Sequence, residues 1–416
     1  MPMTKQSKII QLLEKGAYIP NPEMVDIGEE VVVERIAGEG VSLFAGTRVY
    51  GEKTSIAKGV KLGIEAPVTV VNCQLGSHVE LKGGFYTAST FLANASMGSG
   101  AQLREGCLME EEANGAHTVG MKQTILFPFV TLGSLINCCD CLMAGGTSRR
   151  NHSEVGSSYI HFNYTPNQDK ATASLIGDVP RGVMLNQAPI FLGGQGGIIG
   201  PVRIGYGSVI AAGTVYRGDC PEGGKLIGQQ GQMAYEISFH MGFYADIKRR
   251  ICNNILYIAN ILALRQWYDY IRRPFFMETN DGALYEGAVE KLDLILRERL
   301  GRFRVLSEKM ETSIRISEKI LSGQRKDDLI RQSREFMENW PAIEASLTSG
   351  REGDIGPANR QTLQNIIEKN NSGKVMDYIS CIQNLDSEAV KIGVDWLQSI
   401  VDDVAERIFS LIPACR

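Results

Sequence analysis

Apolar side chains recur every six residues along the N-terminal half of the chain. Phe85, Phe91, Met97, Leu103 and Met109 keep this spacing without interruption, and shorter runs keep it before and after them. An α-helix repeats about every 3.6 residues and an amphipathic strand every two, so neither gives a sustained period of six. Short strands that turn a corner after every sixth residue do give it. The spacing therefore predicts a hexapeptide-repeat β-helix, which is a solenoid of parallel strands.

Glycine follows many of the periodic apolar positions, as at Leu62-Gly63 and Met97-Gly98. Glycine suits the corners of a coil because it adopts positive φ and lets neighbouring backbones approach closely. The repeat runs from about 26 to 226, which is enough for about ten or eleven three-sided coils. Its phase slips at 33–56, around 114–118 and across 149–186, where we expect loops that leave the prism.

A different period follows the Gly- and Gln-rich stretch at 223–231. Apolar residues at steps of three and four predict a helix from Tyr244 to near Pro274, a second around 292–314 and a final one from Ser387. The final helix has a regular 4-3 seam, which is typical of a bundle core, with a subunit contact as the alternative. Trp340-Pro341 and 348–357 are interpreted as a linker or hinge. The predicted domains are 1–25, a short N-terminal helix and lead-in, 26–226, the β-helix, and 227–416, an α-helical domain.

Composition excludes several classes of protein. The net charge of −4 provides no basic field for nucleic acid or for an anionic membrane surface. No apolar run reaches the roughly 18–20 residues that span a bilayer, and the N-terminal segment lacks the features of a signal peptide. The nine cysteines are odd in number and scattered, which indicates reduced thiols in a cytoplasmic protein. Cys138-Cys139-Asp140-Cys141 is interpreted as structural filler, because adjacent strand residues point to opposite faces.

The most informative motifs lie within 148–219. In chain order the motifs are Arg149-Arg150-Asn151-His152, Asn163-Tyr164, Lys170, Ile176-Gly177-Asp178, Leu192-Gly193-Gly194, Pro201-Val202-Arg203-Ile204-Gly205 and Ile210-Ala211-Ala212-Gly213-Thr214. Their order resembles the acetyltransferase half of the bifunctional bacterial N-acetylglucosamine-1-phosphate uridyltransferase and glucosamine-1-phosphate acetyltransferase, a hexapeptide-repeat acyltransferase related to UDP-N-acetylglucosamine pyrophosphorylase. The resemblance covers 151–217 at the level of motifs, and 21–150 only as a repeat.

The resemblance implies a left-handed parallel β-helix that forms a homotrimer, with active sites in clefts between neighbouring prisms. It implies an acyltransferase with acetyl-CoA as co-substrate, a sugar phosphate or nucleotide sugar as the acceptor, and no metal. By their places in the motif, Gly194 would offer a backbone N–H to the thioester oxygen, and Ala212 and Arg217 would line the path of coenzyme A.

The chemistry assigns roles to further residues. An amine or hydroxyl that attacks a thioester needs a base active near neutral pH, which imidazole supplies, and His152 is the predicted base. Asn163, with Tyr164 beside it, would orient the acceptor. The charge of a phosphate needs Arg or Lys, and the chain offers Arg149, Arg150 and Lys170.

The chain also departs from the family's pattern. The family's base histidine lies farther upstream of the Asn-Tyr pair, whereas His152 precedes Asn163 by 11 residues. The spacing from Asn163 to Lys170 is one residue longer than in the family, and 179–190 is an insertion. The residues before Asp26 hold no nucleotide-binding loop, so we expect no uridyltransferase activity.

Two other classes of function stay open. A γ-type carbonic anhydrase has the same β-helix and binds zinc through three histidines, for which this chain offers His117, His152 and His161. A non-catalytic scaffold, in which the β-helix and the helical domain recruit partners, is the other alternative.

Overall fold

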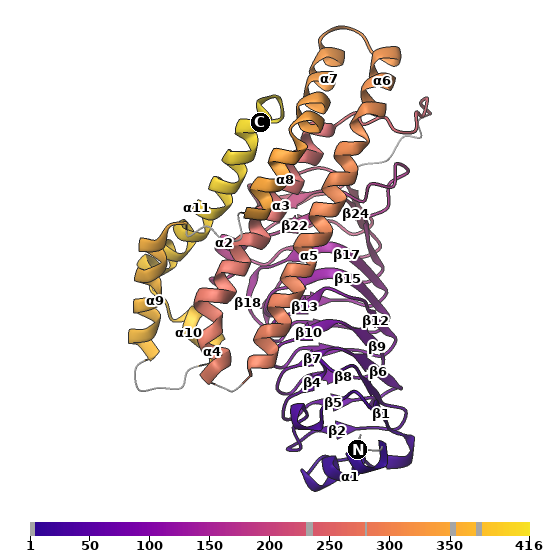
Figure 1. Cartoon of the computed structure of the whole chain (residues 1–416), viewed down its shortest axis with the longest axis vertical. Helices are drawn as coiled ribbons and strands as arrows, with labels where there is room; N and C mark the ends of the chain where they lie inside the picture. Colours follow the sequence, from indigo (N-terminus) through magenta and orange to yellow (C-terminus); the bar gives the residue numbers. More distant parts are fainter. Residues whose placement is uncertain (1–4, 230–235, 279–280, 350–354, 372–376) are drawn as a thin grey trace.

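Short parallel strands stack in coils along the N-terminal half of the chain, and helices make up most of the C-terminal half (Figure 1). The computed structural model describes residues 5–229, 236–278, 281–349, 355–371 and 377–416. The predicted parallel β-solenoid followed by an α-helical region is confirmed. The strands run from Asp26 to Ile227, and the predicted boundary at 223–231 includes two residues outside the described ranges.

The coils form a prism with three faces. Face one contains β1 (Asp26–Ile27), β3 (Arg48–Tyr50), β6 (Val68–Val71), β9 (Gly84–Thr87), β12 (Ala101–Leu103), the first halves of β15 (Val119–Leu126) and β17 (Ile136–Met143), β21 (Tyr159–Phe162), β24 (Gly197–Ile199) and β27 (Val215–Tyr216). Face two contains β4 (Ser55–Ile56), β7 (Gln74–Leu75), β10 (Ser89–Phe91), β13 (Cys107–Met109), the second halves of β15 and β17, β22 (Ser174–Ile176) and β25 (Arg203–Ile204). Face three contains β2 (Ser42–Leu43), β5 (Lys61–Leu62), β8 (Glu80–Leu81), β11 (Ser96–Met97), β14 (Asn114–Gly115), β16 (Thr131–Leu132), β20 (Glu154–Val155), β23 (Phe191–Leu192), β26 (Val209–Ile210) and β28 (Leu226–Ile227).

A ladder of small polar side chains and thiols lines the inside of the corner between faces one and two. Ser89, Cys107, Thr124, Cys141 and Ser174 are all buried in this column. The three hydroxyls donate to the backbone carbonyl two residues earlier, which satisfies polar groups that the corner would otherwise bury unpaired. The cysteines of this column therefore pack the core.

Asp140 explains how Cys138 and Cys141 both point inward. Its backbone has a φ of 59°, so strand β17 turns the corner there without ending. Cys138 and Cys141 are buried on the two sides of the turn, whereas Cys139 is partly exposed. This arrangement agrees with their interpretation as structural filler.

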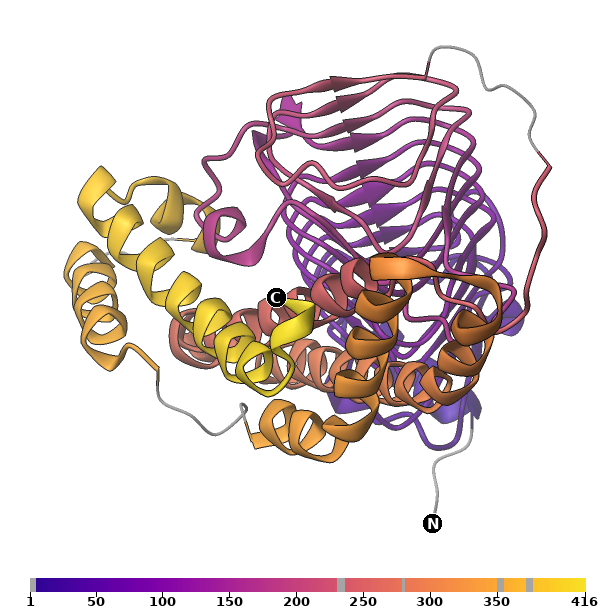
Figure 2. The same ribbon diagram turned by 90° about the horizontal axis from the view of Figure 1, so that it is seen from above.

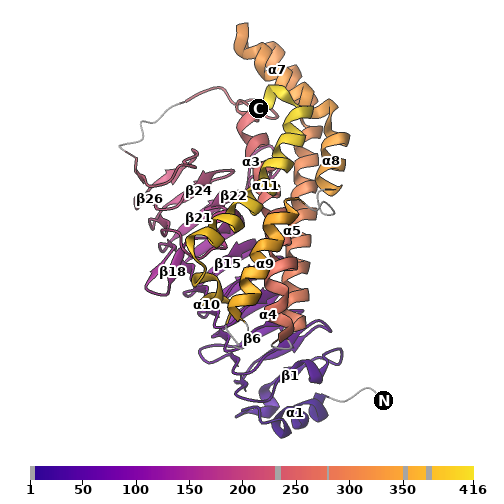
Figure 3. The same ribbon diagram turned by 90° about the vertical axis from the view of Figure 1, so that its left-hand side faces the viewer.

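Two long helices cover face two. Helix α5 (Gly282–Glu308) packs on β7, β10 and β13, and α3 (Ile247–Trp267) packs on β22 (Figure 2). Helices α9 (Pro357–Asn371) and α11 (Ser387–Leu411) form an outer layer (Figure 3). The remaining helices are α1 (Lys5–Glu14), α2 (Val179–Gly182), α4 (Arg273–Glu278), α6 (Met310–Ile320), α7 (Gly323–Glu338), α8 (Trp340–Ser349) and α10 (Tyr378–Gln383), with a π-helical turn at Tyr268–Arg272.

The final helix begins at Ser387 as predicted, and its seam is a bundle core. Leu397, Val401, Val404 and Ile408 are buried, and α11 packs on α3 and α9. The apolar seam is therefore occupied within the chain and is not a subunit contact.

The linker predicted at Trp340-Pro341 is wrong. Trp340 begins helix α8, and its ring packs against Phe303 and Phe336. Pro341 lies in the first turn of the helix, where the N–H that proline lacks would have no helical partner. Of the predicted hinge at 348–357, residues 350–354 lie outside the described ranges. Within those ranges, no helix is long and apolar enough to cross a membrane.

Candidate functional site

The site residues predicted from the sequence lie at all three corners of the prism. Arg149, Arg150 and His152 follow β17 at the corner between faces two and three. Asn163, Tyr164 and Lys170 follow β21 at the corner between faces one and two, where Arg217 also follows β27. Gly194 and Ala212 lie between faces three and one. A single chain thus divides the predicted site into separate groups.

His152 lies on a short hairpin that leaves the prism. Strands β18 (Gly146–Ser148) and β19 (Asn151–His152) pair antiparallel between two parallel coils. The hairpin needs glycine at its base, because Gly146 has a φ of 102° and a Cβ there would lie 2.6 Å from the Cα of His152. This hairpin accounts for the loss of the six-residue period after residue 148.

The contacts of the His152 ring favour one arrangement of its proton. Nδ1 lies 2.9 Å from the carbonyl oxygen of Arg149, which can only accept a hydrogen bond. The neutral ring therefore carries its hydrogen on Nδ1 and a lone pair on Nε2. Nε2 lies 3.6 Å from Oε2 of Glu154, and 20% of the side chain is exposed. The ring is held so that Nε2 can accept a proton, and the Glu154 carboxylate pairs with the ring once it is charged.

Arg149 holds the hairpin against face three. Its Nη1 donates to the carbonyl oxygens of Glu112 and Phe129 at 3.2 and 3.0 Å, and to Oγ1 of Thr131 at 3.0 Å. With the amide oxygen of Asn114 turned toward the guanidinium, the same Nη1 also donates to it at 2.8 Å. These contacts position His152. Arg150, beside it, is exposed.

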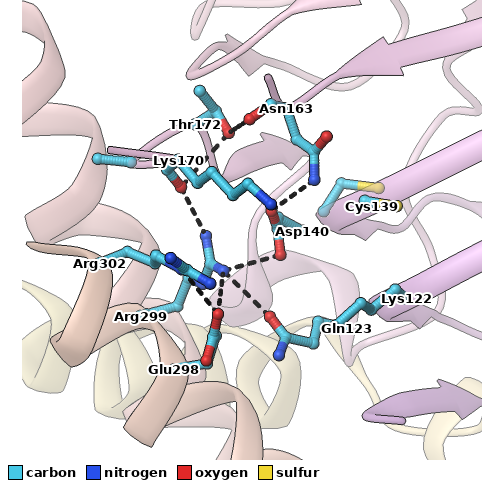
Figure 4. Close-up of polar contacts among 12 residues, drawn as sticks. Lys122, Gln123, Cys139, Asp140, Asn163, Lys170, Thr172, Glu298, Arg299 and Arg302 are labelled. Carbon is cyan, nitrogen blue, oxygen red and sulfur yellow. Dashed lines mark hydrogen bonds and ion pairs between the residues drawn. The ribbon is translucent and has the colours of Figure 1, made fainter. Parts of the chain in front are cut away.

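Asn163 and Lys170 belong to the joint between the prism and α5 (Figure 4). Asn163 Nδ2 donates to Oδ2 of Asp140 at 3.2 Å, and Arg299 of α5 donates to Oδ1 of the same carboxylate at 2.8 Å. Arg299 also donates to the carbonyl oxygen of Lys170 at 3.3 Å. The side chains of Asp140 and Arg299 are only 5% and 2% exposed. The Asn163 amide and the Lys170 carbonyl therefore contribute to this buried network.

Tyr164 and His161 differ sharply in exposure. Tyr164 is 65% exposed, whereas His161 is buried inside the prism with Nε2 2.8 Å from Oγ of Ser174. Burial lowers the pKa of His161 to about 4, so its ring is neutral at neutral pH. His161 is a core residue.

Gly194, Ala212 and Arg217 lie on the outside of the last coils. A Cβ at Gly194 would lie 2.6 Å from the carbonyl oxygen of Ser157, so the stacking of coils already requires glycine here. Ala212 and Arg217 are exposed. Their predicted contacts with coenzyme A stay a prediction.

The three histidines of the carbonic-anhydrase alternative lie apart. His117 is exposed and contacts Ser134 at the corner between faces three and one, His152 is on the hairpin, and His161 is inside the prism. Over the described part of the chain, no group of three or more His, Cys, Asp or Glu side chains is placed to hold a metal ion. The zinc triad considered from the sequence is not assembled within one chain.

Sequence reasoning missed Glu154, Asp140 and Arg299. Glu154 follows His152 by two residues, and only the hairpin geometry brings its carboxylate to the ring. Arg299 is 159 residues from Asp140 and carries no motif of its own.

The curated proteins that this chain resembles include GlmU proteins of different bacteria. The chain is 24% identical over 233 residues to the bifunctional protein GlmU of Thermotoga maritima, which covers 56% of this chain and 46% of that protein. It is 26% identical over 226 residues to GlmU of Pelobacter propionicus, covering 54% and 44% of the two chains. It is 27% identical over 220 residues to GlmU of Nitratidesulfovibrio vulgaris, covering 53% and 43%. The chain thus spans less than half of the length of these relatives.

Two further comparisons add little. No family model matches the chain. Among solved structures, the UDP-N-acetylglucosamine acyltransferase from Campylobacter jejuni aligns with 49% of this chain and 66% of its own at 15% identity, and its TM-score of 0.18 is too low to support an argument. The repeat, the parallel coils and the curated relatives agree with one another. The chain is a hexapeptide-repeat relative of the bifunctional protein GlmU.

Proposed function

We propose that the chain is an acyltransferase that uses acetyl-CoA and acts on a sugar phosphate or nucleotide sugar. The similarity to GlmU over 233 residues supports this proposal, together with the order of the motifs from His152 to Arg217. The observation that carries it is the His152 ring, whose Nδ1 is fixed by a backbone carbonyl while Nε2 keeps its lone pair. A general base needs a lone pair held in a fixed orientation toward the proton that it takes.

In the proposed reaction, the acceptor's amine or hydroxyl attacks the thioester carbonyl. Nε2 of His152 takes the acceptor's proton, and the protonated ring pairs with the carboxylate of Glu154. The bond between the acceptor and the acyl carbon forms, the carbon–sulfur bond breaks, and the proton passes to the departing thiolate of coenzyme A. Arg150, exposed beside His152, would bind a phosphate of the acceptor.

We also propose that the site is shared between subunits of a homotrimer. Gly194 and Ala212, assigned to coenzyme A by the resemblance, lie at a different corner from His152. Residues of one prism that cannot meet within the chain can meet across a contact between prisms. Because α3 and α5 cover face two, faces one and three are available for that contact.

An apolar band on the last coils supports this contact. Along the outer column of face three, Thr131 and Glu154 are followed by Phe191, Val209 and Leu226. Face one carries Ile160 and Phe162 in the same part of the prism. We call Ile160, Phe162, Phe191, Val209 and Leu226 the apolar band, and they are 37–78% exposed in the single chain. An exposed apolar patch of this kind marks an interaction surface.

The proposal is tested by ligand binding and by turnover. Acetyl-CoA and coenzyme A should raise the melting temperature, because a ligand of the native state adds RT ln(1 + [L]/Kd) to its stability. Release of free thiol should follow when an amino-sugar phosphate or nucleotide sugar is added. No stabilisation and no thiol release with any acceptor would leave the scaffold alternative in its place.

A further inference from the structure

Helix α10 of the helical region contacts the hairpin that carries His152 (Figure 3). Nε2 of Gln383, the last residue of α10, donates to the carbonyl oxygen of Thr147 in strand β18 at 2.7 Å. The same Nε2 donates to the carbonyl oxygen of Leu185 at 3.3 Å, in the segment 179–190. The nitrogen of a side-chain amide carries two hydrogens, so it can serve both carbonyls. One side chain thus joins α10 to the hairpin and to the segment beside it.

Helix α10 is a firm support for this contact, because its other side is packed into the helical region. Cys381 and Ile382 are only 2% and 1% exposed. At the start of the helix, the hydroxyl of Tyr378 accepts a hydrogen bond from Nε1 of Trp267 in α3 at 2.9 Å. Gln383 therefore extends from a helix that the core of the helical region holds in place.

The segment 179–190 is attached to the helical region as well. Its helix α2 packs on α3 and α11, and Met184 lies so close to α11 that a Cβ at Gly393 would collide with its methyl group. Near the other end of the segment, the carbonyl oxygen of Gln187 accepts a hydrogen bond from the N–H of Gly146 at 3.0 Å. The base of the hairpin is thus bonded to a segment that the helices fix.

The contact of Gln383 lies close to the groups that orient the His152 ring. Oγ1 of Thr147 accepts a hydrogen bond at 2.9 Å from Nδ2 of Asn151, which directly precedes His152. The carbonyl oxygen of Arg149, which fixes Nδ1 of the ring, belongs to the turn between Thr147 and Asn151. A displacement of Thr147 would therefore move the turn that holds the ring.

The hairpin is supported from two sides. Arg149 fastens its turn to face three, as described above, and Gln383 supports it from the helical region. Among the residues that the structure describes, no other side chain of helices α3 to α11 hydrogen-bonds to 146–152. Catalytic groups must be held close to their productive geometry, and a misplacement of about 1 Å can cost a large factor in rate. The contact at Thr147 is therefore suited to a role in catalysis.

We propose that Gln383 is a positioning residue for acyl transfer, which holds the hairpin so that Nε2 of His152 keeps its orientation toward the acceptor. The inference rests on the proposed function, because it concerns the same base. It assigns a role to the helical region, which completes the support of the hairpin that the prism alone holds on one side.

Two substitutions of Gln383 separate hydrogen bonding from bulk. Gln383→Glu keeps the shape of the side chain, but its carboxylate has no N–H to offer the two carbonyl oxygens. Gln383→Lys keeps a donor, because an ammonium group carries N–H groups. Gln361→Glu is the matched control, since Gln361 is also exposed and its amide donates within helix α9, to Asn365 at 3.0 Å.

Hydrogen exchange of the backbone amides of 146–153 in the full chain, followed by mass spectrometry, tests the contact without any substrate. Exchange should be about tenfold faster in Gln383→Glu, because two hydrogen bonds that oppose local opening are lost. Gln383→Lys and Gln361→Glu should exchange as the wild type does. Equal exchange in the wild type and Gln383→Glu would overturn the inference.

Kinetics with acetyl-CoA and amino-sugar phosphates test the positioning role. Gln383→Glu should lower kcat about tenfold and leave both KM values unchanged, because the base acts in the transition state. Gln383→Lys should restore kcat, which a general loss of folding would not allow. Faster exchange in Gln383→Glu with unchanged kcat would overturn the positioning role. A wild type that releases no thiol would overturn the proposed function, and the exchange experiment would still decide whether Gln383 holds the hairpin.

Discussion

Arg299 of helix α5 donates to Asp140 at 2.8 Å, and both side chains are almost fully buried. Asp140 is the residue at which strand β17 turns from face one to face two. The same guanidinium donates to the amide oxygen of Gln123, which turns the corner one coil earlier. The helix is thus fastened to two successive corners of the prism (Figure 4).

Arg299→Met should destabilise the protein strongly. Removing one partner of a buried ion pair leaves the other charge without compensation, which costs about 3–5 kcal/mol. The free energy of unfolding from denaturant titration measures the loss. Lys53→Met is the matched control, because Lys53 also pairs with α5, through Glu290 at 3.1 Å, but both side chains are exposed. That control should cost at most about 1 kcal/mol. Equal losses in the two variants would contradict this account of the joint.

Glu110 makes stability depend on pH at a second contact between prism and helices. It accepts a hydrogen bond from Tyr268 at 2.6 Å, and burial raises its pKa to about 7 from 4.5, with Arg272 opposing the shift and Glu111 adding to it. The native state keeps this proton to a higher pH than the unfolded chain does. The stability that Glu110 contributes is therefore lost as the pH rises from about 4.5 to about 7. Glu110→Gln should therefore lose less stability than wild type between these pH values. Urea titrations at several pH values measure the difference, with Glu80→Gln as the control, since the Glu80 side chain is only partly buried, at 32% exposure.

His161 should act in the opposite direction over nearly the same pH range. Burial lowers its pKa from 6.5 to about 4. Between these pH values the unfolded chain binds a proton that the native state does not bind. Stability is then lost as the pH falls from about 6.5 to about 4. His161→Gln, which can still reach Ser174, should remove this loss. A pH profile of the variant parallel to that of wild type would show that His161 is accessible to protons in the native state.

The coils of the β-helix and the buried side of the last helix could be predicted, because both follow from the spacing of apolar residues. The six-residue period marks inward positions in most coils, although Phe85 is exposed and Tyr86 is buried in its place. The seam from Val390 to Leu411 marks the side of α11 that packs in the bundle. The pair Trp340-Pro341 was wrongly interpreted as a linker, because proline also occurs in the first turn of a helix. The packing of α5 on face two could not be predicted, since pairs such as Arg299 and Asp140 lie 159 residues apart and show no pattern.

The candidate site was predicted only in part, for a related reason. His152 lies on a hairpin where a loop was expected, but the motif order gave no sign that Asn163 would lie at another corner. Motifs record the order of residues along the chain, whereas a prism places successive segments on different faces. Within one chain the predicted residues lie at separate corners, which the order of the motifs does not show.

His152→Ala should lower the rate of acyl transfer by about 10²–10⁴, the usual contribution of a general base. Glu154→Gln should lower it less, because Glu154 stabilises the charged ring and does not take the proton itself. His117→Ala is the control, since His117 is an exposed histidine at another corner. Thiol release from acetyl-CoA with amino-sugar phosphates measures the rates. Activity of His152→Ala equal to that of His117→Ala would remove His152 from the mechanism.

The apolar band makes the trimer testable at single positions. Light scattering of the wild type should give three times the chain mass of 45.7 kDa. Phe191→Glu combined with Val209→Glu should give monomers, because closing the contact would bury charges without partners. Ser42→Glu is the matched control, since Ser42 lies in the outer column of the same face but in the first coils, far from the band. If the double variant remains a trimer, the contact lies elsewhere. If it becomes a monomer and keeps full activity, the site is complete within one chain and the shared cleft is wrong.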